Sequence, residues 1–133
     1  MKNQHSRKVR FVKATLERTD EGSHASVELS GEGDARFTGS ADGRASDEEL
    51  LRTGALAAAT AVAEASGVRG ATVEVKDIAV LHEFGAEIVL VSIEGTVRDQ
   101  TKQLYGVCSV RGDLAAAAAL AVLNATNRVF DLA

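Results

Sequence analysis

Four polar residues stand where helices could present them for binding, namely Ser46, Asp113, Asn124 and Asn127. Ser46 and Asp113 each precede a run of small residues that predicts a helix. The free amides of a first helical turn bind anions and polar groups, so these two positions could frame a small polar or anionic site. Asn124 and Asn127 are three residues apart and share one side of a helix. They fit either capping and solvent contact at the helix end or a polar pocket at an interface.

Residues suited to catalysis are few and are not grouped. The single cysteine, Cys108, has no histidine near it in the sequence to activate it, so we expect a buried, inert thiol. His82-Glu83 lacks the second histidine of a zinc-binding helix and falls in an expected turn. We find no paired carboxylates, no nucleophile–base spacing and no Cys/His ligand set. The sequence therefore predicts a protein that is not an enzyme and needs no metal or cofactor.

The composition predicts one domain with a core of small aliphatic side chains. Hydrophobic residues make up 45% of the 133 residues but aromatic residues only 4%, so Val, Leu, Ile and Ala must build that core. The net charge is −4 and no basic face stands out, so we expect no nucleic-acid partner. No apolar leader and no run of about 18 apolar residues is visible, so we expect a cytoplasmic protein without a membrane partner.

Hydrophobic periodicity predicts six strands and two helices after a flexible tail of residues 1–8. Ser46 and Glu49 form a capping box at the start of the first helix, and Gly67 is suited to end it. Asp113 begins the second helix, which ends near residue 130. The expected strands cover residues 9–18, 25–30, 35–41, 71–81, 87–97 and 102–110.

The order of elements is βββα in each half. Gly39 lies seven residues before Ser46, and Gly106 lies seven residues before Asp113. This equal spacing predicts an internal duplication with pseudo-repeats at about 9–67 and 71–130. The expected fold is a single α+β domain, residues 9–133, in which an antiparallel sheet packs two small-residue-rich helices on one face.

The tripeptide Arg111-Gly112-Asp113 can be interpreted as an adhesion motif or as a helix start. We favour the helix start, because Asp113 occupies the capping position that Ser46 fills in the first half. The alanine run Ala115–Ala119 that follows makes a thin helix with high helix propensity. Two thin helices predict close contact with each other as well as with the sheet.

The strand over 87–97 is apolar on both of its faces. Leu90 and its neighbours Ile88 and Ser92 point one way, and Val89, Val91 and Ile93 point the other way. Such a strand is usually buried on both faces, and two helices can cover only one of them. We expect another copy of the chain to cover the second face and form a homodimer. The alternative is that the sheet curls and buries both faces itself.

The duplicated order and the end of the second helix resemble a known family. Gly112-Asp113-Leu114 followed by Asn124-Ala125-Thr126-Asn127-Arg128 is similar to the C-terminal regulatory domain of 2-isopropylmalate synthase and citramalate synthase. The resemblance implies a duplicated βββα unit that dimerises and binds an end-product amino acid, leucine or isoleucine, near the dimer interface. The link before the first helix, residues 39–46, lacks the proline that this family usually carries.

Three functional hypotheses follow. The first is a non-catalytic homodimeric binding or regulatory module for a small amino acid or an acyl metabolite. The second is a structural or protein-interaction protein that uses the second face of the sheet. The third is an enzyme, which would require a cleft with perturbed titratable groups. The first hypothesis agrees best with the residues and with the family resemblance.

Overall fold

The computed structural model describes residues 9–67 and 69–130, and the side chains at 47, 48 and 127–130 are excepted. The tail predicted for residues 1–8 lies outside this range. The elements are β1 (Arg10–Thr19), β2 (Gly22–Ser30), β3 (Arg36–Gly43), α1 (Asp47–Ser66), β4 (Thr72–Glu83), β5 (Ala86–Val97), β6 (Gln100–Ser109) and α2 (Leu114–Phe130). This order confirms the predicted βββα-βββα arrangement and the α+β class.

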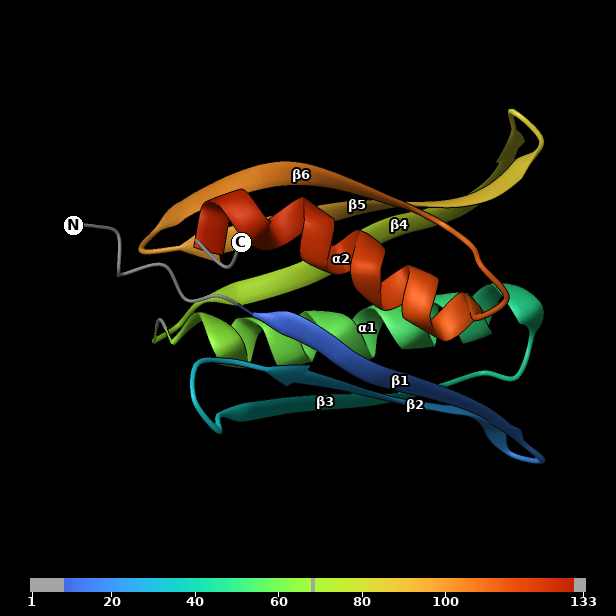
Figure 1. The fold of residues 1–133 in the computed structure, drawn as a ribbon, viewed down its shortest axis with the longest axis horizontal. Coiled ribbons are helices and arrows are strands. Elements are labelled where there is room, and N and C mark those ends of the chain that lie inside the picture. The colour runs from blue at the N-terminus through green and yellow to red at the C-terminus, as the bar shows by residue number, and fades with distance from the viewer. Residues whose placement is uncertain (1–8, 68, 131–133) are drawn as a thin grey trace.

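The strands form two antiparallel sheets, β1-β2-β3 and β4-β5-β6, where the sequence suggested one. The two helices lie side by side between the sheets (Figure 1). Helix α1 packs on β2 and β3 and also contacts β4, whereas α2 packs on β5 and β6 and also contacts β1. Each helix thus touches both halves of the chain. The helices tolerate this position because they carry few polar side chains at their contacts.

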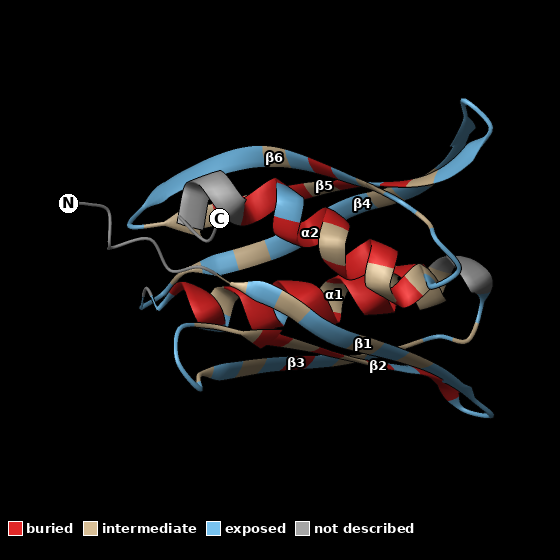
Figure 2. Ribbon diagram, in the orientation of Figure 1, coloured by how far each residue is buried: buried red, intermediate tan, exposed pale blue. Residues whose placement is uncertain are grey.

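The alanine-rich helices form the middle of the core. Their surfaces are buried almost all round, and the strands above and below are buried mainly where they face the helices (Figure 2). Val27 and Leu29 of β2 and Val91 and Ile93 of β5 are at most 1% exposed. Thin helices let both sheets approach closely, which explains the alanine content. The buried alanines of the helices are Ala55, Ala57, Ala58, Ala59, Ala61, Ala65, Ala115, Ala117, Ala118, Ala119, Ala121 and Ala125.

The two sheets repeat one another in register. Val27 pairs with Gly39 in the first sheet, and Val91 pairs with Gly106 in the second. The first strand of each sheet carries a β-bulge at the equivalent place, at Val12 in β1 and at Lys76 in β4. A shared bulge is an independent sign of duplication, because bulges are retained features of a fold.

The third strand of each sheet crosses its helix at a glycine. A Cβ atom on Gly39 would overlap the backbone of α1 at Ala57, and one on Gly106 would overlap the backbone of α2 at Ala121. Ala57 is eleven residues beyond its cap, whereas Ala121 is eight residues beyond Asp113. Counted from the helix cap, the crossing point therefore lies about one helical turn further along α1 than along α2. The pairing of strands within each sheet is the same in both halves.

The helix ends confirm the predicted caps. Ser46 Oγ accepts the Glu49 amide at 3.4 Å, and Gly67 ends α1 in the left-handed conformation at φ 69°. Asp113 Oδ1 accepts the Ala116 amide at 3.1 Å, so the Arg-Gly-Asp tripeptide is a helix start. Among the described residues, neither helix is long and apolar enough to span a membrane.

Candidate functional site

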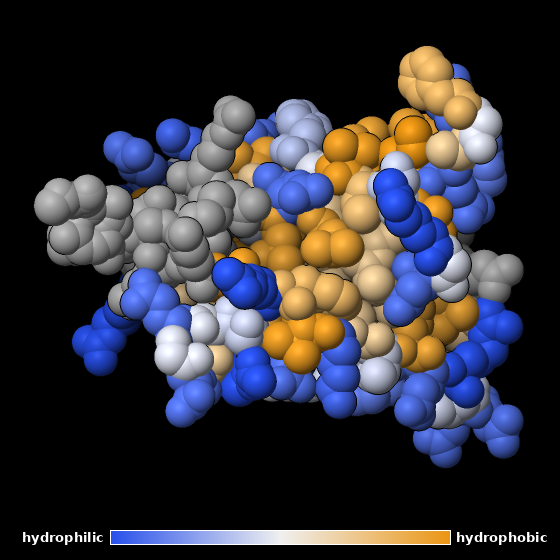
Figure 3. All heavy atoms as spheres, in the orientation of Figure 1, coloured by the Kyte–Doolittle hydropathy of each residue, from blue (hydrophilic) through white to orange (hydrophobic). Residues whose placement is uncertain are grey.

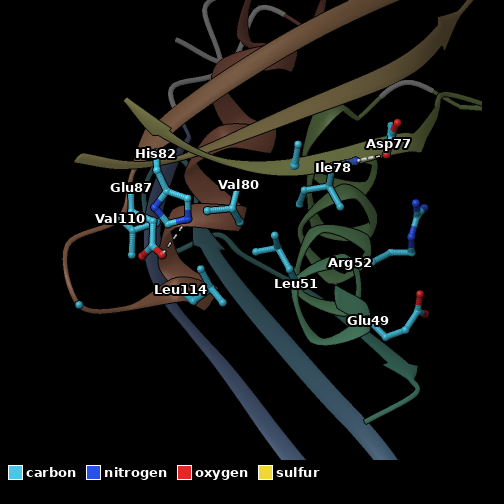
Figure 4. A pocket seen from close by; sticks show the side chains of 12 residues that line it. Glu49, Leu51, Arg52, Asp77, Ile78, Val80, His82, Glu87, Val110 and Leu114 are labelled. Carbon is cyan, nitrogen blue, oxygen red and sulfur yellow. Dashed lines mark hydrogen bonds and ion pairs between the residues drawn. The ribbon is translucent and has the colours of Figure 1, made fainter. Parts of the chain in front are cut away.

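A cleft of about 880 Å³ opens between the β4–β5 hairpin and the first turns of the helices (Figure 4). Side chains on a strand alternate, so Ile78 and Val80 of β4 both point towards the helices. Leu51 of α1 and Leu114 of α2 approach from the other side (Figure 4). The consecutive elements α1 and β4 and the distant helix α2 therefore build the apolar centre of this cleft.

Charged groups flank that apolar centre on two sides (Figure 4). On one side His82 Nε2 lies 4.0 Å from Glu87 Oε2. On the other side are Glu49, Arg52 and Asp77, and Asp77 Oδ1 accepts the Ile78 amide at 2.8 Å. The cleft thus offers an apolar middle with a cation and carboxylates at its rim.

The base of the β4–β5 hairpin differs in side-chain size from the base of the β1–β2 hairpin, its counterpart in the first half. In the β1–β2 hairpin, Ser23 Oγ donates to the Arg44 carbonyl at 2.7 Å and lies 3.1 Å from Thr53 Oγ1 of α1. The register of the repeat places Glu87 where the first half has Ser23. A buried serine can close against a helix, but a charged glutamate stays hydrated at the surface. The helix equivalent to α1 in the second half is α2. This difference therefore favours a hairpin that stands away from α2 and leaves the cleft open.

The predicted site residues do not form one cluster. Ser46 and Asp113 use their side-chain oxygens as helix caps, at the end of the molecule where the cleft lies. Asn124 is ten residues beyond Leu114, about 15 Å along the helix. Its Nδ2 donates to the Val107 carbonyl at 2.8 Å and ties α2 to β6. The side chain of Asn127 lies outside the described residues.

Sequence reasoning missed the residues that line the cleft. The alternation of β4 indicates that Ile78 and Val80 share a face, but no local pattern shows that Leu51 lies opposite them. Arg52 resembles any other helix-surface arginine in the sequence. Its position becomes informative only after β4 is placed over α1.

Cys108 lies in β6 and lines a second, smaller pocket together with Arg111 and Asp113. Partial burial raises the pKa of its thiol above the usual range, and the positive charge of Arg111 opposes that shift. A raised pKa keeps the thiol protonated and unreactive at neutral pH. The thiol is half-buried rather than buried as the sequence predicted, and its inertness stays a prediction. No group of three or more potential metal ligands is present among the residues that the structure describes.

No protein-family model matches the chain, and no curated protein matches it. The resemblance to the synthase regulatory domain therefore stays a prediction from sequence and topology. A functional assignment must rest on the cleft and on the exposed surfaces.

Proposed function

We propose that this chain is a non-catalytic, homodimeric regulatory module that binds a small amino acid or acyl metabolite in the cleft. The observation that carries the proposal is an apolar centre flanked by charged groups. Small-molecule sites are typically clefts of roughly 300–1,000 Å³ with few polar groups for orientation. The cleft falls within that range.

The lining suggests how such a ligand would be held. A branched aliphatic chain would contact Leu51, Ile78 and Val80, and its burial would supply most of the affinity. A carboxylate on the ligand would pair with the Arg52 guanidinium, whose planar donors suit that group. An amino group would be attracted to Glu49 or Asp77. An acyl metabolite has no amino group, so it would use only the aliphatic contacts and the pairing with Arg52.

The chemistry of the lining favours binding over catalysis. The described lining contains no serine, threonine, cysteine or lysine, and the groups that could react, His82 and the carboxylates, lie at its exposed rim. The half-buried thiol of Cys108 lines a separate pocket and not the cleft. A ligand held here would be recognised and released unchanged.

A thermal-shift screen tests the proposal. The probes are the twenty amino acids and short branched carboxylates, each at millimolar concentration. Binding to the folded state raises the melting temperature as the ligand concentration exceeds Kd. We expect aliphatic compounds with a carboxylate to produce this shift and Arg52→Gln to remove it.

Arg36→Gln is the matched control, because Arg36 lies on the outer side of the first sheet and pairs with Glu28 at 3.3 Å. This variant should keep the full shift. The proposed ligand site would be wrong if no probe stabilised the wild-type protein or if Arg52→Gln responded like the wild type.

The second candidate function is protein interaction through the outer side of the second sheet. Tyr105 is 64% exposed there and Val107 is 50% exposed. If this function were the correct one, the chain alone would be a monomer or a mixture of oligomers and would form a discrete complex with another protein.

A further inference from the structure

Strand β4 lies at an edge of the second sheet, because the strand order is β4-β5-β6. The Val110 amide donates to the Glu87 carbonyl at 2.8 Å, so the backbone groups of Glu87 point towards β6. Successive residues of an antiparallel ladder direct their backbone groups to alternate sides. By the register of β4 and β5, the amides and carbonyls of Ile78, Val80 and His82 therefore point away from the sheet.

The cleft runs along this free edge. Its lining includes the four consecutive residues 77–80 of β4, although consecutive side chains of a strand point to opposite faces. A cleft that touches both sets must pass the edge of the strand. Asp77 Oδ1 accepts the Ile78 amide and so covers the first outward amide. Among the residues that the structure describes, none is hydrogen-bonded to the amide or the carbonyl of Val80.

The opposite edge of the second sheet is protected. There Asn124 Nδ2 of α2 donates to the outward carbonyl of Val107 in β6 at 2.8 Å. Natural sheets cover exposed edges in such ways, because free amides and carbonyls recruit further strands. The second sheet thus covers the middle of β6 and leaves β4 open to the cleft.

We infer that the cleft binds a short free peptide in an extended conformation, which adds to the sheet as a strand beside β4. This ligand rests on the proposed function, because it uses the same cleft, and it replaces the single amino acid by a longer class of molecule. The peptide residue opposite Val80 would accept the Val80 amide and donate to the Val80 carbonyl. Its side chain would point towards the helices, as that of Val80 does. In strand addition, such main-chain hydrogen bonds supply affinity and pockets for alternate side chains supply specificity.

The dimensions of the cleft fit a peptide of about four or five residues. From Ile78 to His82 the edge spans about 13 Å, at a rise of about 3.3 Å per residue. The cleft volume of about 880 Å³ lies near the upper end of the roughly 300–1,000 Å³ of small-molecule sites. Alternate side chains of the peptide would face Leu51 and Leu114 (Figure 4). At this hairpin end of the molecule, apolar side chains reach the surface between hydrophilic ones (Figure 3).

The charges of the cleft indicate the direction of the peptide. Arg52 and Glu87 lie on opposite sides of the apolar centre (Figure 4). A C-terminal carboxylate near Arg52 and an N-terminal ammonium near Glu87 make the peptide antiparallel to β4. The described lining holds three carboxylates, those of Glu49, Asp77 and Glu87, but only one guanidinium. This excess of negative charge favours a peptide with a net positive charge.

Isothermal titration calorimetry of the full chain tests the added strand. The probe is the pentapeptide Lys-Val-Ser-Leu-Ser, whose apolar second and fourth residues would face the helices, and free leucine is the reference. The amides of these two residues would then face β4, whereas the amide of the third would face away. We expect N-methylation of the fourth residue to weaken binding at least tenfold and N-methylation of the third less than threefold. Free leucine should bind at least tenfold more weakly than the probe.

Hydrogen exchange and charge changes provide readouts of the binding mode. The Val80 amide should exchange at least tenfold more slowly in the complex, whereas the amide of Leu16, the equivalent residue of β1, should not change. Glu87→Gln and N-acetylation of the probe should each weaken binding at least threefold. Glu32→Gln, in the turn between β2 and β3, is the matched control and should leave binding unchanged.

Each outcome decides between the added strand and its alternatives. Equal effects of the two N-methyl groups, or a Val80 amide that does not slow, would overturn the added strand. An acetylated probe that binds as tightly as the parent would overturn a free peptide as the ligand. A probe that binds no more tightly than leucine would overturn the peptide and leave the proposed small-molecule site standing. A probe that binds in the expected pattern, while no amino acid or acyl compound binds, would support the peptide and overturn the smaller ligand.

Discussion

At the scale of single residues, the closest packing in the molecule depends on two glycines. Gly39 and Gly106 allow a strand to touch the backbone of a helix, at Ala57 and at Ala121. Any side chain at these positions would push the helix away from its sheet. The thin alanine helices and the strand glycines are thus two parts of one packing arrangement.

Two glycine substitutions with opposite outcomes test this arrangement. Gly106→Ala should lower the free energy of unfolding by about 1–3 kcal/mol, because its Cβ would overlap the Ala121 carbonyl. Gly54→Ala should raise it by up to about 1 kcal/mol, because alanine favours helix and its Cβ would lie at an ordinary 3.7 Å from Ala118 Cβ. Urea denaturation measures both. Equal effects of the two variants would contradict the close crossing.

At the scale of elements, the helix starts confirm what the sequence pattern predicted. Ser46 and Asp113 have the same capping role in the two halves, with different side chains. Each cap satisfies an amide that the helix cannot pair internally. Ser46 Oγ and Asp113 Oδ1 therefore have a structural role in the fold, and a ligand role for these two residues stays a prediction.

Capping variants test this assignment. Ser46→Ala and Asp113→Ala should each lower the free energy of unfolding by about 0.5–2 kcal/mol, since each leaves a helix amide without its cap. Asp113→Ser should change it little, because serine caps equally well. Thermal and urea denaturation provide the measurement. If Asp113→Ser were as unstable as Asp113→Ala, the carboxylate would have a role beyond capping.

At the scale of the whole molecule, the two pseudo-repeats form one core. Helix α1 contacts β4 of the second half, and α2 contacts β1 of the first. Neither half can bury its helix alone, because each helix is covered from both sides (Figure 2). The duplicated units therefore should not behave as independent domains.

Native-state hydrogen exchange tests this cooperativity. The amides of β2 in the first half and of β5 in the second should exchange with the same free energy, equal to that of global unfolding. A single urea transition should accompany this result. Two plateaus of exchange free energy, one for each half, would show that the repeats unfold separately.

The sequence alone determined the local features of this protein. The caps at Ser46 and Asp113, the stop at Gly67 and the two-sided strand around Leu90 all depend on near neighbours in the chain, so periodicity and spacing reveal them. The duplication was visible for the same reason, because Gly39 and Gly106 keep equal distances from their caps. A binding role for Ser46, Asp113, Asn124 and Asn127 stays a prediction, although the first two side chains also cap the helices.

Only the tertiary structure decided how the strands divide and where the cleft lies. Six antiparallel strands can form one sheet or two. The outcome depends on which strand edges pair after the helices are buried, and no local sequence pattern indicates that pairing. The cleft depends on Leu51, Val80 and Leu114, which meet only because the second sheet lies over both helix starts. The apolar character of Leu90 was readable from the sequence, but its exposure became evident only when the two sheets were seen to enclose the helices.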